Sequence, residues 1–362
     1  VCSSSDLCLS PFDSSRLRGP KSLLEFRKLG GMGGGASTQS KVDTQQVKVR
    51  PGVDCKQVVY NRERAWHVAI VGAGFVGTSC AFALVCKGTG ANVTLTDVNA
   101  KKCEGEVLDL EDGGAKVAVA TPKEAGQADV IVITAGRAQR EGETRLDLVK
   151  ANSGIMRSVI EGMKPLNPRA KIIVVSNPCD VLTYVAQECS GLPESQVFGS
   201  GTVLDSMRLR IAVSQAIEVS SASINLMVLG EHGDSQFPVA SLANIGGVPM
   251  LKAPCMRGVD LDKMAKDSAS KAYDIIAKKG YTAFGIGQAV ETIVDAVIND
   301  RGVVLPVSVR VPGRSCCLSM PSVVRVNGVE RVVDNIVQHF SSIEASRFQA
   351  SVEGMEKIIA GL

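Results

Sequence analysis

Hydrophobic residues follow two different patterns in the first half of this chain. Short continuous apolar runs occur at residues 67–71, 130–133 and 172–175. Strands without polar alternation are typical of a parallel sheet that helices cover on both faces. Helical patterns at 75–87 and 100–111 flank a further strand at 93–96. This strand–helix–strand order predicts a Rossmann-type, doubly wound α/β fold.

The pattern changes near residue 199. Beyond it we expect amphipathic helices at 204–216, 260–279 and 287–299, a strand at 303–311, short strands at 317–320 and 322–326 that lead into a turn at Asn327-Gly328, and a final helix from 343. The chain is therefore divided into a leader or N-terminal arm (1–66), a Rossmann domain (67–198) and a second, α+β domain (199–362), which we expect to hold a substrate.

Charge is distributed unevenly between the leader and the rest. The chain contains 40 Lys and Arg residues and 37 Asp and Glu residues. The first 66 residues hold eleven of the basic and six of the acidic residues, so the remainder is nearly neutral, with 29 basic and 31 acidic residues. A nearly neutral body excludes a nucleic-acid binder. Eleven cysteines without C-x-x-C spacing or a nearby histidine cluster predict a reduced, intracellular chain with no metal site.

The location depends on how the leader is interpreted. No apolar run is long enough to cross a bilayer, so we expect a cytoplasmic protein without stable membrane insertion. Residues 1–31 weakly resemble an organellar transit peptide, although Asp6, Asp13 and Glu25 oppose that interpretation. If Met32 initiates translation, Gly33 to Ser37 satisfy the myristoylation pattern instead.

The first strand runs directly into a glycine motif, Gly72-Ala73-Gly74-Phe75-Val76-Gly77, which opens a predicted helix. In G-x-G-x-x-G the first glycine permits the turn, the second admits a pyrophosphate and the third lets helix pack on strand. Asp97 stands twenty residues after Gly77, at the end of the next strand. A carboxylate there binds ribose hydroxyls and repels a 2′-phosphate, so we predict NAD as the cofactor.

Only one of the three histidines lies in a catalytic context. His67 begins a strand, as an edge or surface residue, and His339 lies near a helix end, so both are interpreted as structural. His232 lies between glycines in Gly230-Glu231-His232-Gly233-Asp234, directly after an apolar run. This position predicts an imidazole that is exposed to a cleft.

Gly-Glu-His-Gly-Asp-Ser resembles the active-site motif of the lactate/malate dehydrogenase family. Other segments agree in order and spacing: Glu141 to Leu146, Ser176 to Asp180, and Gly199 to Arg208. The resemblance covers about residues 66–362. It implies reversible hydride transfer between NAD(H) and a small 2-keto or 2-hydroxy acid.

The resemblance also implies roles for individual residues. His232 would be the proton donor, Asp205 its orienting carboxylate and Arg208 the clamp for the substrate carboxylate. Arg145 would stabilise the developing alkoxide. The nicotinamide and substrate positions fall on Asn177, Ser200, Thr282 and Ile286. Asp180 we interpret as a helix N-cap without a catalytic role.

The family distinguishes lactate from malate by a residue six positions before the loop arginine. Counting back from Arg145 gives Gln139, and a neutral side chain there favours pyruvate and L-lactate. Arg140 is the next residue, so a shift of one position would favour oxaloacetate and malate instead. The order Arg137-Ala138 also departs from the usual lactate pattern.

Two further expectations concern assembly and a non-enzymatic alternative. The helix after Asp97 resembles the element that forms dimers in the family, which predicts a homo-oligomer, either a tetramer or a dimer. A non-catalytic protein with a dehydrogenase fold is the remaining hypothesis, since a fold does not guarantee a function. The presence of His232, Asp205, Arg145 and Arg208 opposes it.

Overall fold

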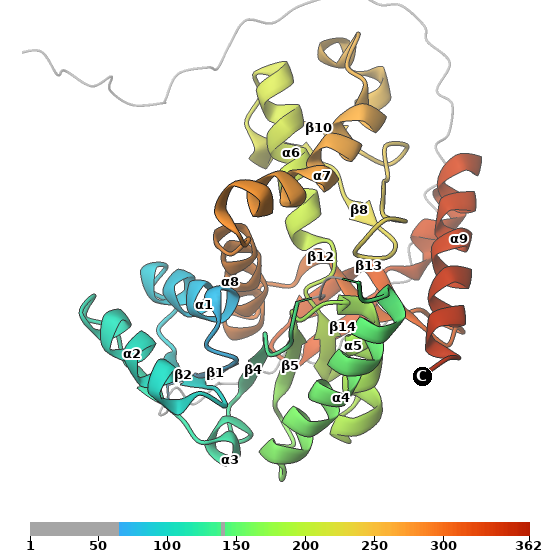
Figure 1. Ribbon diagram of the computed structural model, residues 1–362. Helices are drawn as coiled ribbons and strands as arrows, with labels where there is room; N and C mark the ends of the chain where they lie inside the picture. The colour runs from blue at the N-terminus through green and yellow to red at the C-terminus, as the bar shows by residue number, and fades with distance from the viewer. Residues whose placement is uncertain (1–64, 139–141) are drawn as a thin grey trace, which may run out of the picture. The chain divides into compact units, whose positions relative to one another are not determined.

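The computed structural model describes residues 65–138 and 142–362, with Arg145 described through its backbone alone. Six parallel strands form the first part of its main sheet (Figure 1): β1 (His67–Val71), β2 (Asn92–Thr96), β3 (Val117–Val119), β4 (Val130–Ile133), β5 (Lys171–Val174) and β6 (Val197–Gly199). Their order is β3-β2-β1-β4-β5-β6. The strand order reverses between β1 and β4, as in a Rossmann fold. The predicted doubly wound fold is confirmed.

Helices cover both faces of the parallel strands. One face carries α1 (Phe75–Cys86), α2 (Ala100–Glu111) and α8 (Phe284–Ile298); the other carries α3 (Pro122–Ala125), α4 (Arg145–Met163) and α5 (Cys179–Ser190). Val68 and Ile70 of β1 pack in the core with α1 and α8, whereas Ala69 and Val71 pack with α4 and α5. Successive strand side chains point to opposite faces, so a continuous apolar run fills two cores.

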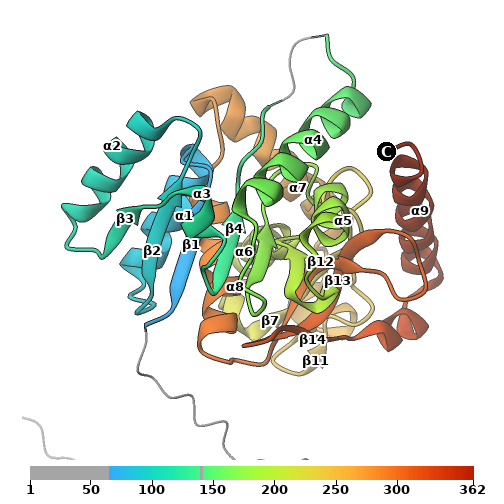
Figure 2. The same cartoon turned by 90° about the horizontal axis from the view of Figure 1, so that it is seen from below.

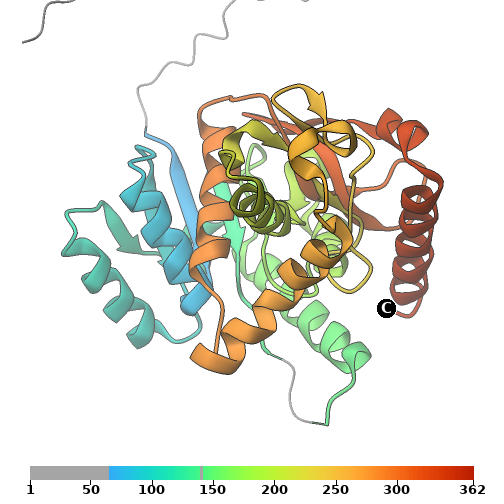
Figure 3. The same ribbon diagram turned by 90° about the horizontal axis from the view of Figure 1, so that it is seen from above.

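The second half of the chain extends this sheet and builds a smaller layer. It contains β7 (Ile224–Asn225), β8 (Val228–Leu229), β9 (Phe237–Pro238), β10 (Asn244–Ile245), β11 (Val248–Pro249), β12 (Val303–Arg310), β13 (Cys317–Arg325), β14 (Gly328–Val332), α6 (Val203–Ile217), α7 (Leu261–Lys279) and α9 (Ser342–Ile359). Antiparallel β12, β13 and β14 continue the main sheet, and β12 joins β6 where Ser308 pairs with Gly199. Helices α6 and α7 lie side by side (Figure 3).

Two short strands predicted around Pro321 are in fact one strand, β13. Pro321 lies opposite Pro306 of β12. The Pro321 carbonyl accepts from the Val333 N–H, and the Pro306 carbonyl accepts from the Thr202 N–H. Both prolines therefore turn their backbone polar groups away from each other, and the missing N–H groups leave the ladder between β12 and β13 intact.

Two smaller expectations were also wrong. Strand β1 is central, between β2 and β4, so His67 is not at the edge of the sheet. The side chain of His67 is half-buried and places Nε2 2.8 Å from Thr94 Oγ1. Helix α8 begins at Phe284 and not at Gly287. A Cβ at Gly287 would lie 2.6 Å from the Ser79 carbonyl oxygen, so this glycine allows α8 to pack closely on α1, beside which it lies in Figure 1.

None of the described helices combines the length and apolarity that crossing a membrane requires.

At the side of the main sheet away from α2, helix α9 packs against α5 and β13 (Figure 2).

Candidate active site

The carboxyl ends of the parallel strands place the predicted cofactor residues along one edge of the sheet. Because neighbouring parallel strands end at the same edge, the segments that follow them lie next to one another. These segments begin at Gly72 after β1, Asp97 after β2, Thr134 after β4, Val175 after β5 and Ser200 after β6, and the segment after β5 contains Ser176 and Asn177.

The three motif glycines have different surroundings. Gly72 has φ +109°, and a Cβ there would lie 2.8 Å from the Ala135 nitrogen. A Cβ at Gly77 would lie 1.8 Å from the Gly72 carbonyl oxygen, so a side chain cannot fit. Gly74, the N-cap of α1, has no atom within 4 Å of a built Cβ and caps the helix without a side chain. The helix N-terminus is thus open to an approaching phosphate.

Asp97 lies directly beside this turn. Its Oδ2 accepts a 2.7 Å hydrogen bond from the Ala73 N–H, and its Oδ1 accepts one of 2.8 Å from the Asn99 N–H. The half-buried carboxylate therefore stands at the mouth of the glycine turn, the position that an adenosine ribose requires.

His232 and Asp205 form a close pair. Nδ1 of His232 lies 2.9 Å from Oδ2 of Asp205, which stands in the first turn of α6 with its side chain 7% exposed. Burial lowers the pKa of His232, but the charge of Asp205 and its hydrogen bond raise it more, so the net shift is upward. Burial raises the pKa of Asp205, but the charge and hydrogen bond of His232 together with the charge of Arg208 outweigh it, so the net shift is downward. Both shifts favour an imidazolium–carboxylate pair.

Arg208 lies one turn further along α6 and faces the same carboxylate. Its Nη1 is 3.7 Å from Oδ1 of Asp205, and its side chain is 13% exposed. Burial lowers the pKa of Arg208 and the charge of Asp205 opposes that shift. An arginine remains charged in this setting. Asp205 thus lies between the His232 imidazole and a cation whose geometry suits binding a carboxylate.

Asp180 was wrongly predicted to be an N-cap. Pro178 occupies the N-cap of α5, and the buried Asp180 carboxylate reaches across to the loop that contains His232. Its Oδ2 accepts from the His232 backbone N–H at 2.7 Å, and its Oδ1 accepts from the Ser308 hydroxyl at 2.6 Å. Burial raises the pKa of Asp180 to about 6, although both hydrogen bonds oppose the shift. In the sequence, Asp180 stands among the apolar residues Cys179, Val181 and Leu182. This setting could have indicated a buried carboxylate that bonds distant parts of the chain.

Asn152 is a second residue that sequence reasoning missed. It is buried in α4, and its Nδ2 donates to the carbonyl of Asn177 at 2.7 Å. Its amide also bonds both backbone groups of Arg137, each at 3.1 Å. Asn177 itself is exposed after β5 and precedes a cis proline, Pro178. Nothing in the local sequence around Asn152 indicated these contacts, which span 15 and 25 residues.

The remaining predicted residues are placed with differing completeness. Ser200 is buried, with its hydroxyl 3.8 Å from the Cys179 thiol. Thr282 is half-buried just before α8, and Ile286 packs against the main core from the first turn of that helix. Gln139 lies outside the described residues, and the side chain of Arg145, the first residue of α4, is not described.

The beginnings of α8 and α6 are brought together near the catalytic pair. A Cβ built at Gly285 would lie 3.1 Å from a methyl group of Leu204, the residue before Asp205. The structure therefore places Ile286 on the helix that packs against the beginning of α6, with Thr282 just before that helix. Within the described residues, no three His, Cys, Asp or Glu side chains gather as a metal site would require.

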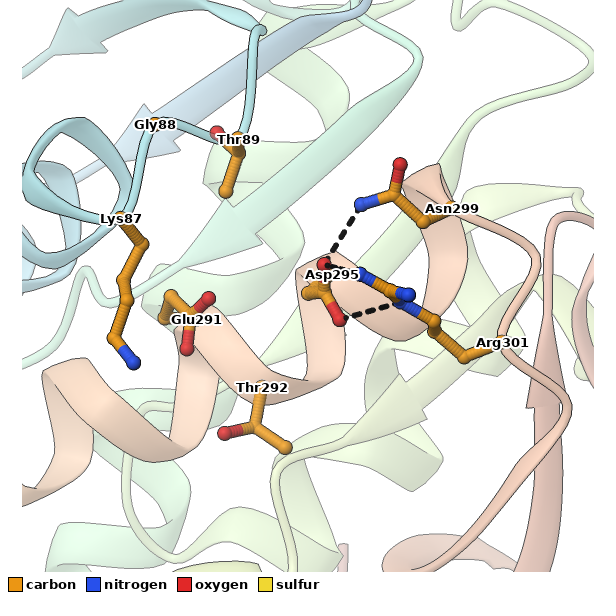
Figure 4. Close-up of a pocket in the computed structure, with 8 residues that line it drawn as sticks. All are labelled: Lys87, Gly88, Thr89, Glu291, Thr292, Asp295, Asn299 and Arg301. Carbon is orange, nitrogen blue, oxygen red and sulfur yellow. Dashed lines mark hydrogen bonds and ion pairs between the residues drawn. The ribbon is translucent and has the colours of Figure 1, made fainter. Parts of the chain in front are cut away.

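A separate polar pocket of about 410 Å³ lies between the end of α1 and helix α8 (Figure 4). Two of its charged groups are paired with each other: Asp295 accepts from Arg301 at 3.0 Å and also from Asn299 at 2.7 Å. The pocket contains none of the residues predicted for catalysis or cofactor binding, so it is distinct from the candidate active site.

Comparisons with known proteins agree with this geometry. Two family models match: lactate/malate dehydrogenase, NAD binding domain, over residues 66–199, and lactate/malate dehydrogenase, alpha/beta C-terminal domain, over residues 202–361. The chain is 42% identical to L-lactate dehydrogenase A of Rhizopus oryzae (74% of this chain, 85% of that one) and 38% identical to L-lactate dehydrogenase of Acetivibrio thermocellus (74% and 89%).

A solved structure gives the same result. The minor L-lactate dehydrogenase of Enterococcus mundtii, in a ligand-bound form, superposes with a TM-score of 0.78 at 36% identity, covering 82% of this chain and 98% of that one. Fold, site geometry and sequence identity over most of the chain all lead to one conclusion: this chain belongs to the lactate/malate dehydrogenase family.

Proposed function

We propose that this protein is an NAD-dependent L-lactate dehydrogenase, which reversibly reduces pyruvate to L-lactate. The observation that carries the proposal is the His232–Asp205 pair, 2.9 Å apart, with Arg208 facing the same carboxylate. Reduction of a 2-keto acid needs a proton donor and an anchor for the substrate carboxylate, and these residues supply both. The named relatives are L-lactate dehydrogenases, which supports the same activity.

The described residues fit NAD(H). The pyrophosphate would lie over Gly74 at the open N-terminus of α1, with Gly72 and Gly77 as the close-packed glycines of the turn. Asp97 would bind the adenosine ribose and repel a 2′-phosphate. Asn177, Ser200 and Ile286 would contact the nicotinamide end. When bound, the cofactor supplies the hydride.

The chain itself would manage the proton and the substrate. Protonated His232 donates to the carbonyl oxygen through Nε2, because Nδ1 is held by Asp205. Arg208 binds the substrate carboxylate with two parallel hydrogen bonds. Arg145 stabilises the developing alkoxide. Gln139, Asn177 and Thr282 complete the contacts to the substrate.

The choice of substrate is tested by comparing kcat/KM for pyruvate and oxaloacetate, with NADH as reductant and purified full-length chain. A large preference for pyruvate is expected if Gln139 faces the substrate methyl group. A preference for oxaloacetate would show that Arg140 reaches the second carboxylate and would replace this proposal with malate dehydrogenase. No activity with either, despite NADH binding, would favour the non-catalytic alternative.

Domain roles, assembly and location belong to the same proposal. Residues 67–198 would bind the cofactor and residues 199–362 the substrate, as the two family models support. A homo-oligomer, dimeric or tetrameric, would use α2, where Leu108 is 65% exposed. Sedimentation of the purified chain tests the assembly. We further propose a cytoplasmic location.

A further inference from the structure

The loop that carries His232 is attached to the C-terminal helix. This catalytic loop, Gly230–Ser235, follows β8 and begins at Gly230, which forms an isolated bridge with Ser319 of β13 through hydrogen bonds of 2.9 and 3.2 Å. Ser351 of α9 then contacts the loop on both sides of His232. Its side chain is buried, in a residue only 2% exposed.

The Ser351 hydroxyl makes three contacts with the loop. It lies 2.7 Å from the Ser235 hydroxyl, donates to the Ser235 carbonyl at 3.0 Å and accepts from the Glu231 N–H at 3.4 Å. Ser235 in turn donates to Oε2 of Glu231 at 2.7 Å. Since the Ser235 proton is used on Glu231, the Ser351 proton is directed to an oxygen of Ser235. These bonds link the two ends of the loop through one side chain.

Gly230 shows how closely the helix approaches. A Cβ at this position would lie 2.9 Å from the Ser351 hydroxyl oxygen, and the backbone has φ +91°, which an L side chain rarely adopts. The glycine therefore permits the turn and also leaves room for Ser351. With Ser351 2% exposed, water has little access to replace the hydroxyl if it is removed.

Helix α9 is firmly anchored at this point. Phe348, Val352 and Met355, on the same side of the helix as Ser351, are buried in the main core. At the helix N-terminus, Glu344 completes a capping box with Ser341 and accepts from the Ser241 N–H at 3.0 Å and the Ser241 hydroxyl at 2.5 Å. A helix held in this way can fix the geometry of a loop that packs on it.

We propose that Ser351 is a positioning residue for His232, because the Ser351 hydroxyl holds both ends of the catalytic loop on α9. The catalytic consequence of this role rests on the proposed dehydrogenase function. His232 is faced by Asp205 and Arg208 from α6 and by Asp180 from α5. The 2.9 Å contact with Asp205 requires the imidazole in one place. Misplacement by about 1 Å can cost on the order of 100-fold in rate.

The test compares Ser351→Ala with Ser346→Ala, a matched control at an exposed serine of the same helix. In Ser351→Ala we expect kcat for pyruvate reduction to fall about tenfold, with the Kd for NADH unchanged. We also expect the pKa of His232 to fall toward its ordinary value, because the loosened loop weakens the contact with Asp205. The control should match the parent in all three measurements.

The pKa is measured by NMR titration of the imidazole, which needs no turnover. With three histidines in the chain, a His232→Gln variant assigns the signal. The titration therefore tests the positioning role even if the parent reduces neither pyruvate nor oxaloacetate, a result that would overturn only the proposed function. An unchanged His232 pKa in folded Ser351→Ala would overturn the positioning role. The same conclusion would follow if activity fell only in proportion to the amount of folded protein.

Ser235→Ala provides the second variant if Ser351→Ala does not fold. It removes the hydroxyl that bridges Ser351 and Glu231 but retains the Ser235 carbonyl, the other acceptor for Ser351. We expect a smaller shift of the His232 pKa in the same direction. A His232 pKa in Ser235→Ala that equals the raised value of the parent would contradict a role for this network.

Discussion

The glycine turn after β1 and the catalytic loop are built in different ways. Within the turn, a Cβ at Gly77 would lie 1.8 Å from the oxygen of Gly72, only five residues away, and Asp97 bonds a residue 24 positions from it. In the catalytic loop, His232 bonds residues 27 and 52 positions away, and Glu231 bonds one 120 positions away. The turn is shaped by close backbone packing, at Gly77 within the turn and at Gly72 against Ala135, whereas the loop is held by long-range polar contacts.

This difference separates two kinds of effect. Changes in the turn should act on cofactor affinity, because the backbone geometry there shapes the pyrophosphate site. Changes around the loop should act on turnover, because the proton donor must be placed and charged correctly. The variants below test that separation, in order of decreasing expected effect.

The largest effect is expected from His232→Gln. Removing the proton donor should lower kcat for pyruvate reduction by about 1000-fold, within the range for general acid catalysis. NADH affinity, measured by fluorescence titration, should remain within about twofold. Substantial residual kcat would show that another group donates the proton.

Asp205→Asn should have the next largest effect. Because the charge and hydrogen bond of Asp205 raise the pKa of His232, their loss should lower that pKa and deplete the protonated donor as pH rises. We expect kcat/KM for pyruvate to fall about 100-fold at pH 7, less at lower pH. The check is the pH profile of kcat/KM from about pH 5 to about pH 9, and an alkaline limb that is not shifted to lower pH would contradict the role of the pair.

Asp97→Ala tests the turn and should affect binding. Loss of the ribose acceptor should raise the Kd for NADH about tenfold and leave kcat at saturating NADH nearly unchanged. Removal of the negative charge should also improve the relative use of NADPH. A large fall in kcat with unchanged affinity would break the separation between the two regions.

The smallest effect is expected from Asp180→Asn, measured as stability. Burial raises the pKa of Asp180 from 3.8 to about 6, so the parent should lose stability as pH rises from about 4 to 6, by at most about 3 kcal/mol. Asparagine can still accept from the His232 N–H but cannot ionise. The Tm of the variant relative to the parent should therefore rise by a few degrees between pH 4 and pH 7.

The sequence was sufficient to predict the parallel strands, which are continuous apolar runs, and the glycine turn, which is a motif of fixed spacing. It also pointed to His232, Asp205 and Arg208 through a family resemblance, and the structure brings these three side chains together. It failed for Asp180, Asn152 and Ser351. Their contacts join segments distant in the chain, and a polar residue in a helix does not show which distant backbone group it will bond.

The junction between β6 and β12 has a mechanical consequence. One hydrogen-bonded sheet runs through both halves of the chain, and at the junction Ser308 is also bonded by the buried Asp180. A hinge rotation of one half against the other would have to break both connections. Rearrangement on ligand binding should therefore be confined to segments outside the sheet, such as α7, in which Ser268 is the only buried residue. Hydrogen exchange should be fast in α7 and slow across the junction.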